Sequence, residues 1–567
     1  MMRTKIRIYA LIMALILVTG IFVACKEDPP IPDPLDEEID PSRTQLYVYN
    51  FNGGYGTEWL VQAKKRYEAL HAEDTHWEEG KKGVQIYINP PKSHVNPSAV
   101  LTNRDEVYFT EYAYYYTYLA EGILGDITQA VTGDNTAYGD KPGQTIESKL
   151  TAEQKAYYGI EENGETKYYA LPHYAGYAGL VYNVDLFESK GYYFAKEPGA
   201  TGDISDYFIY NADDPRSSGP DGIEDTYDDG LPSTYEEFFT LCRYIAMDGN
   251  TPVCWPGANY KDYLNRLVES LVANNEGLDQ MLLKYSLEGV ASSLGTIVDD
   301  QFVADEAVTA ITKGLGAETY RSEGIYRALE FLNKLCVTED FHNSLAFNNG
   351  YSHMNAQEDF LYAGHDGETA PIAMMCEGIW WEMEAIQTFT DMTNSMGEEF
   401  SRNNRNFGFM PLPKTSKEQI GQKNTLLDHI YSLCFMKSNV AEWKIPLALD
   451  FIKFVNSDAS LVEFSQVTST PKALNYTMTQ EQMKAMSPFG RSLMTVKNNS
   501  NILYPFSPNA TYRNAQSNFT YDSMYTSQIT GLGTFKYAAE AFHDHNVSPE
   551  DYFKGMYVYY SSQPYLN

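Results

Sequence analysis

The chain has 567 residues, of which 43% are hydrophobic, and a formal net charge of −34 at pH 7. This acidic excess excludes nucleic-acid binding and a basic membrane-binding surface. A chain of this length exceeds what one hydrophobic core usually supports, so we expect two lobes and a globular monomer. Aromatic residues reach 14%, with 46 tyrosines, whose flat faces and hydroxyls suit sugar rings as well as strand cores.

The N-terminal residues predict export. A basic segment, Met1–Lys5, precedes an apolar run over Ile6–Val23, which ends at Ala24 directly before Cys25. A basic start, an apolar stretch and a small-residue cleavage site are typical of a secretory signal peptide, here residues 1–24. The cysteine at the cut resembles a bacterial lipoprotein signal, which implies a lipid on Cys25. The alternative is an uncleaved membrane anchor, because the apolar run is almost long enough to span a bilayer.

A stalk is predicted over residues 25–43. Residues 26–42, KEDPPIPDPLDEEIDPS, hold five prolines and seven acidic residues. Such a segment buries too little apolar surface to offset its ordering entropy, so we expect it to be extended and disordered. It would hold a body that begins near Thr44 away from the outer face of the cytoplasmic membrane.

The other cysteines do not predict a disulfide framework. They are odd in number and widely spaced, without C-x-x-C pairs, which argues against a zinc site or a redox dithiol. We expect most to be buried and inert, and a Cys242–Cys254 bridge is left open. The five are Cys242, Cys254, Cys336, Cys376 and Cys434.

Strands and helices alternate along the body. Periodicity predicts strands at 46–50, 83–88 and 106–109, helices at 58–70 and 110–120, and a β-like segment from 168 to 183 that leads into a helix at 184–190. Alternation of this kind indicates α/β lobes with parallel sheets, whose ligands bind beyond the carboxyl ends of the strands.

Five segments, in chain order, together resemble a known family. They are ALPHYAGYAGLVYNVDLFESK (Ala170–Lys190), LPSTYEEFFTLCRYI (Leu231–Ile245), AMMCEGIWW (Ala373–Trp381), the strand Phe407–Pro413, and Ala448–Leu474 with FIKFVNSDAS and TSTPKAL. Each is weak alone, but the five in order resemble extracellular solute-binding proteins of the maltose-binding-protein type. One departure is Tyr235, where the family usually has tryptophan.

The resemblance implies a periplasmic-binding-protein-like fold, with two α/β lobes that close on a ligand. Its three crossings between lobes would fall near Leu171–Leu180, Gly408–Lys414 and Val467–Lys472. Lobe one would comprise residues 44–172 and 412–465, and lobe two residues 179–408 and 470–567.

The resemblance also implies a function: capture of a sugar or oligosaccharide for delivery to the permease subunits of an ABC importer, with no chemistry performed on the ligand and no cofactor. An extracytoplasmic glycosidase is one alternative, but carboxylate pairs carry no signal among 76 acidic residues. A surface receptor not coupled to transport is the other, and the sequence does not separate it from an importer.

Two short segments after predicted strands offer ligand-binding residues. The turn Asn52–Gly56 exposes backbone N–H groups ahead of a helix, so Asn52 and Tyr55 are candidates, although the glycines also fit a plain strand–helix turn. Glu111 and Tyr112 follow the next strand. A carboxylate accepts sugar hydroxyl protons, and a neighbouring ring packs on the sugar's C–H face.

The implied first crossing adds three candidates, His173, Tyr174 and Tyr177, because a ligand between lobes must pass close to it. Hinge packing is the alternative for Tyr177.

Tryptophans supply two more candidates. Trp255 lies on a predicted loop next to Pro-Gly. Trp380 and Trp381 are adjacent and cannot point the same way, so we expect Trp380 to face ligand and Trp381 to be core.

An acidic insertion spans residues 203–230. Its segment Asp225–Gly230, with Glu236 beyond, partly matches an EF-hand loop, and Asp225, Asp229 and Glu236 would be the Ca²⁺ ligands. Tyr227 departs from the pattern at the third position, and a solvated acidic loop is the alternative.

Overall fold

The computed structural model describes residues 38–365, 367–519, 524, 526–529 and 532–567. The predicted signal peptide, Cys25 and most of the predicted stalk lie outside these residues. Within them, no helix combines the length and the apolar character needed to cross a membrane.

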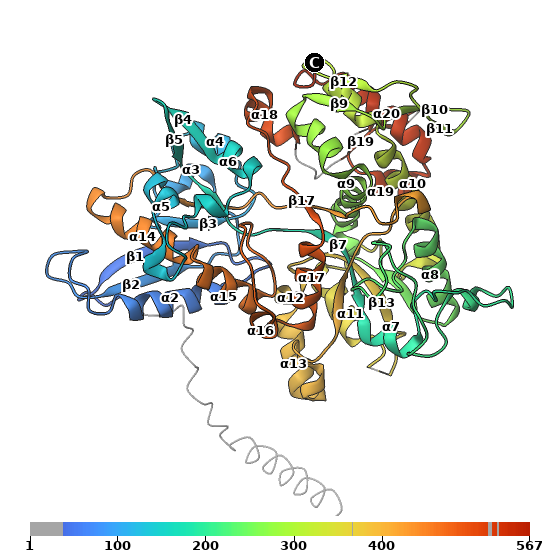
Figure 1. The fold of residues 1–567 in the computed structure, drawn as a ribbon, viewed down its shortest axis with the longest axis horizontal. Helices are drawn as coiled ribbons and strands as arrows, with labels where there is room; N and C mark the ends of the chain where they lie inside the picture. The colour runs from blue at the N-terminus through green and yellow to red at the C-terminus, as the bar shows by residue number, and fades with distance from the viewer. Residues whose placement is uncertain (1–37, 366, 520–523, 525, 530–531) are drawn as a thin grey trace, which may run out of the picture.

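The first lobe is built on a five-stranded sheet in the order β2-β1-β3-β16-β6 (Figure 1). Central strand β1 pairs in parallel with β2 and β3, whereas β16 runs antiparallel to β3 and β6. Every residue of β1, TQLYVYN, is buried, as expected of a strand covered on both faces. The bounds are β1 Thr44–Asn50, β2 Val84–Asn89, β3 Val107–Thr110, β6 Leu171–Pro172 and β16 Leu433–Met436.

Three helices pack together on this sheet: α2 (Glu58–Leu70), α14 (Ile445–Val455) and α15 (Asp458–Thr468). Tyr67 of α2 packs edge-on against Phe451, and its hydroxyl donates to the Asp450 carboxylate at 2.8 Å. The lobe thus unites the N-terminal segment with residues almost 400 positions later.

The second lobe is built on a four-stranded sheet in the order β14-β7-β13-β8. Strands β8 and β13 are parallel, while β7 runs antiparallel to both β13 and β14. The bounds are β7 Ala178–Asn183, β8 Thr251–Cys254, β13 Ile372–Gly378 and β14 Phe407–Met410, with helices α7 Val184–Lys190, α8 Tyr235–Met247, α9 Tyr260–Ser286, α10 Glu323–Val337, α11 His353–Tyr362, α12 Trp381–Glu384, α13 Ile386–Met396 and α17 Pro488–Asn498.

Smaller elements complete both lobes. In the first lobe they are α3 Pro97–Val100, α4 Tyr115–Ala120, α5 Thr128–Thr132, α6 Ala152–Tyr158 and the hairpin β4 Gly159–Glu162 with β5 Glu165–Tyr168. Around α9 and α10 lie β9 Gly289–Ala291, β10 Gly295–Val298, β11 Gln301–Ala304, β12 Thr309–Ile311, α18 Ala510–Ala515, β18 Thr526–Ile529, β19 Gly533–Phe535, α19 Ala538–His545 and α20 Pro549–Ser561, at the upper right of Figure 1. Strands β15 Thr425–Leu427 and β17 Asn501–Leu503 pair beside α9, and α16 is Gln480–Met483.

Two predictions about the elements were wrong. The sheets are mixed rather than purely parallel, because one strand in each, β16 in the first lobe and β7 in the second, runs antiparallel to both of its neighbours. The helix predicted at 110–120 begins only at Tyr115, since Tyr112 adopts a left-handed φ of 52° that interrupts helical backbone.

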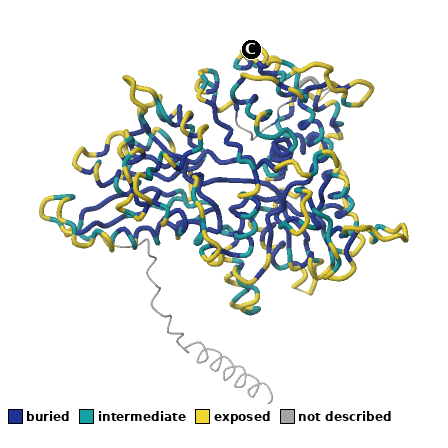
Figure 2. The backbone as a smooth tube through the Cα atoms, viewed as in Figure 1, coloured by how far each residue is buried: buried dark blue, intermediate teal, exposed yellow. Residues whose placement is uncertain are grey.

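The chain passes between the two sheets after β6, after β14 and after α15, and residues 173–177, 411–414, 424–432 and 469–474 of these passages are buried (Figure 2). The first two lie against each other: Asp428 Oδ1 accepts from the backbone N–H groups of Gly176 and Ile430, each at 3.0 Å. A Cβ on Gly176 would lie 2.3 Å from the Ile430 side chain, so glycine is required for this approach.

The third passage is tied to the first by an unusual buried pair. Lys472 Nζ lies 2.7 Å from His173 Nδ1, and the same ammonium position is 4.4 Å from the centre of the Trp59 ring. Burial lowers the pKa of Lys472 to about 7 and holds that of His173 well below its usual range. All five described cysteines are buried and free, so the Cys242–Cys254 bridge is not formed.

Lys472 should make stability depend on pH. It is largely neutral in the folded protein above pH 7 but takes up a proton on unfolding, so stability should rise as pH increases from 7 towards 9.5. Below pH 7 it is protonated in both states and adds no slope. We expect Lys472→Met to remove up to about 1.4 kcal/mol per pH unit of this slope in urea unfolding. The exposed Lys484→Met is the control; equal slopes in wild type and Lys472→Met would contradict the assignment.

Candidate ligand-binding cleft between the lobes

A cavity of about 220 Å³ lies where the two lobes meet. Both lobes and the passage between β14 and β16 contribute to its walls. The first lobe supplies Phe51, Gly53, Gly54, Tyr55, His94, Glu111 and Tyr112, the second supplies Tyr263, Arg266, Trp380 and Glu384, and the passage supplies Ile430.

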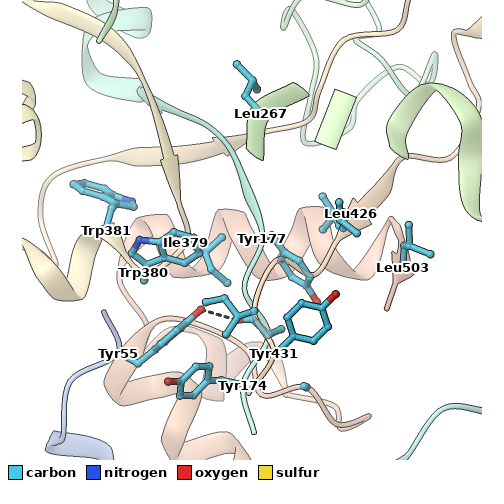
Figure 3. Close-up of a cluster of buried hydrophobic side chains, with 14 of the residues drawn as sticks. Tyr55, Tyr174, Tyr177, Leu267, Ile379, Trp380, Trp381, Leu426, Tyr431 and Leu503 are labelled. Atoms are coloured by element: carbon cyan, nitrogen blue, oxygen red, sulfur yellow. Dashed lines mark hydrogen bonds between the residues drawn. The ribbon is translucent and has the colours of Figure 1, made fainter. Parts of the chain in front are cut away.

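Trp380 forms the aromatic wall on the second lobe and contacts the first lobe directly. A Cβ on Gly54 would lie 2.7 Å from Trp380 Cβ, so only a glycine there lets the tryptophan approach the turn after β1. Figure 3 shows Trp380 on the side of Tyr55, while Trp381 points away. Trp381 is fully buried among phenylalanines, including Phe407 and Phe489.

Two hydrogen bonds and a ring contact hold the side chains of the first-lobe wall in place. The Tyr174 hydroxyl donates to Glu111 Oε1, and the Tyr174 ring lies 4.0 Å from that of Tyr55. Tyr55 in turn donates to the carbonyl of Ala175 at 2.6 Å. Burial raises the pKa of Glu111 to about 7 despite the Tyr174 hydrogen bond. These contacts fix the carboxylate before any ligand binds.

One cation bridges the lobes inside the cavity. Arg266, on α9, donates from Nη2 to the Tyr112 hydroxyl at 2.9 Å, and its guanidinium carbon lies 5.2 Å from the centre of the Trp380 ring. Tyr112 reaches this position through the left-handed backbone described above, a local strain that often accompanies binding sites.

Glu384 lines the cavity from the second lobe, whereas Glu111 lines it from the first. Its Oε2 accepts from Gln357 Nε2 at 2.8 Å, and the same amide lies 3.3 Å from Glu377. Burial raises the pKa of Glu384, as it does that of the neighbouring Glu377. The cavity therefore combines aromatic faces with carboxylates and a guanidinium.

Of the nine residues proposed from sequence, four line the cavity: Tyr55, Glu111, Tyr112 and Trp380. Tyr174 lies directly behind them and orients Glu111.

The other four do not line it. The backbone N–H of Asn52 donates to Pro91, and His173 faces Lys472. Tyr177 is buried beside the passages. Trp255 is fully buried against His342 and Phe347, because its loop folds inward over the second lobe. An apparent loop tryptophan can thus belong to the core.

Six lining side chains were missed by sequence reasoning. Sequence patterns could have identified three of them. Tyr263 and Arg266 are three apart on one face of the helix after β8, and Glu384 is four residues after Trp380. Phe51 directly follows β1. Nothing in the sequence marks His94 or Ile430, which reach the cavity only through the packing of distant segments.

The acidic insertion forms internal contacts. The Asp225 N–H donates to Asp229 Oδ2 at 2.8 Å, whereas Glu236 is exposed on the first turn of α8. Over the described ranges, no three His, Cys, Asp or Glu side chains group in a way that could hold a metal. Calcium binding by Asp225, Asp229 and Glu236 stays a prediction.

Comparison with known proteins supports the fold. No protein-family model and no curated protein sequence matches the chain. Among solved structures, a chitin oligosaccharide binding protein matches with a TM-score of 0.52 at 12% identity, over 92% of this chain and 98% of that one. Maltose-bound T. maritima MalE3 matches with a TM-score of 0.51 at 13% identity, over 91% and 99%. The protein therefore has the two-lobe α/β fold of periplasmic binding proteins.

Proposed function

We propose that this protein captures a sugar or oligosaccharide in the interlobe cavity, without chemistry on it, and delivers it to an ABC importer. The observation that carries the proposal is the cavity itself, whose walls come from both lobes and the passage between them. A ligand held there contacts both lobes at once, so its binding energy favours the closed arrangement.

The cavity walls suit carbohydrate. The Trp380 and Tyr112 rings can pack on the C–H face of a pyranose, while Glu111, Glu384 and Arg266 offer directional hydrogen bonds to its hydroxyls. The solved structures with this fold include proteins described as binding chitin oligosaccharide and maltose, which supports a saccharide ligand.

The proposal also covers how the protein is attached to the membrane and which proteins receive the sugar. A lipid on Cys25 would hold the protein at the outer face of the membrane on the stalk, within reach of permease subunits. A receptor without transport would use the same cavity, and loss of sugar uptake on deletion of the gene separates the two roles.

Titration with a panel of oligosaccharides tests binding. We expect at least one member to bind, small-angle scattering to show compaction when it does, and chromatography to show the sugar intact after prolonged incubation. A shortened product would instead favour the glycosidase alternative, and a tight binder with an unchanged scattering profile would contradict closure.

Substitution of the paired tryptophans should separate ligand contact from core packing. Trp380→Ala should weaken binding by roughly two- to tenfold, the contribution of one stacked ring. Trp381→Ala should cost roughly 3–5 kcal/mol of stability, because it empties a core site. Calorimetric affinity and melting temperature are needed for each variant. The reverse pattern would show that the roles are exchanged.

Lipidation is tested on the precursor. Cys25→Ser should leave an unlipidated, uncleaved chain, whereas the wild type should partition into detergent and carry a lipid-modified N-terminus by mass spectrometry. Wild-type protein with a free N-terminus upstream of Cys25 would contradict the anchor.

A further inference from the structure

The cavity has an imbalance of charge that the proposed function does not explain. Glu111 lines it from the first lobe and Glu384 from the second, so each lobe contributes a carboxyl group to the same cavity. Glu377 lies directly behind Glu384, linked to it through the amide of Gln357. Among the lining residues, all within the described part of the chain, Arg266 is the one with a permanent positive charge.

Arg266 is already engaged. Its guanidinium contacts the Tyr112 hydroxyl and lies over Trp380. The other basic side chain of the wall, His94, has its pKa lowered by burial and is therefore neutral at pH 7. Two carboxyl groups thus line the wall against one permanent cation, an excess of groups that can carry negative charge.

Burial makes this excess costly. A carboxylate removed from water is stabilised by a nearby opposite charge and otherwise tends to take up a proton. Burial raises the pKa of Glu111 to about 7 and raises that of Glu384. A cation within the cavity would favour both ionised forms, so a positively charged ligand would suit this wall.

Aromatic faces surround the same space. Phe51, Tyr112, Tyr263 and Trp380 all line it, from four different segments of the chain. Rings attract a cation through the negative potential over their faces, and rings combined with carboxylates are how proteins bind ammonium groups. The T-shaped contact between Tyr112 and His94, with ring centres 5.0 Å apart, holds one of these faces in place.

We propose that the ligand is a saccharide bearing a protonated amine, with its ammonium group between Glu111 and Glu384. The inference rests on the proposed function and narrows its substrate class. The sugar ring would contact the aromatic wall, and the ammonium group would supply the charge that Arg266 alone does not balance.

Matched ligands test the charge directly. Glucosamine, N-acetylglucosamine and glucose, each as the monosaccharide and the β-1,4-linked disaccharide, carry an ammonium, an acetamide or a hydroxyl at the same carbon. The galactose series and putrescine complete the panel. By isothermal titration calorimetry at pH 7, the amine should bind at least about tenfold more tightly than its hydroxyl counterpart in at least one series.

Charge-removing variants locate the contact. Glu111→Gln and Glu384→Gln preserve side-chain size, and each should reduce the preference for amine over hydroxyl by roughly tenfold. Affinity for the neutral sugar should change much less. Glu442→Gln, on an exposed turn of the first lobe, removes one charge outside the cavity and is the matched control. Unchanged melting temperatures exclude unfolding as the cause.

The outcomes separate this inference from the proposed function. If neutral sugars bind as tightly as their amine counterparts, or if the glutamine variants weaken both alike, the amine assignment is overturned and saccharide binding stands. If putrescine binds but no saccharide does, the proposed function is wrong. If Glu442→Gln lowers the amine preference as much as the cavity variants, the charge acts from a distance and the direct contact is overturned.

Discussion

One buried face of helix α9 holds the centre of the molecule together. Ser270 donates to the carbonyl of Ala178 at the start of β7 and lies 2.8 Å from His429 Nε2 in the second passage. One turn on, the Asn274 amide donates to the carbonyl of Leu412 at 3.0 Å. Leaving buried backbone groups unpaired would cost free energy of folding. The contacts from this face of α9 therefore hold the first and second passages in place relative to the second lobe.

The same helix places the functional groups. Arg266 and Tyr263 lie one and two turns before Ser270, so the face that holds the passages continues into the cavity wall. The geometry of the cavity is therefore coupled to that of the passages between the lobes. A shift of the second lobe relative to the passages would move Arg266 away from Tyr112 and open the cavity.

The passages themselves contain buried polar groups, which a purely apolar connection between the lobes would lack. Asp428 is held by two backbone N–H groups, and burial raises its pKa to about 7. Lys472 and His173 form a second buried polar contact. Buried polar groups of this kind add little to the free energy of unfolding. Each has few alternative hydrogen-bond partners, however, so these groups specify how the passages pack.

The sequence by itself determined the local strands and helices, their alternation along the chain and the expectation of two lobes. It could do so because apolar periodicity and turn residues act over short range. It found α2 and α7 with their observed bounds, and it placed Tyr55, Glu111, Tyr112 and Trp380 at strand ends that reach the cavity. Only the tertiary structure decided that Trp255 is core, that β7 and β16 run antiparallel to their neighbours, and that Arg266 and Glu384 line the same cavity as Glu111. These outcomes depend on contacts between segments hundreds of residues apart, which no local pattern encodes.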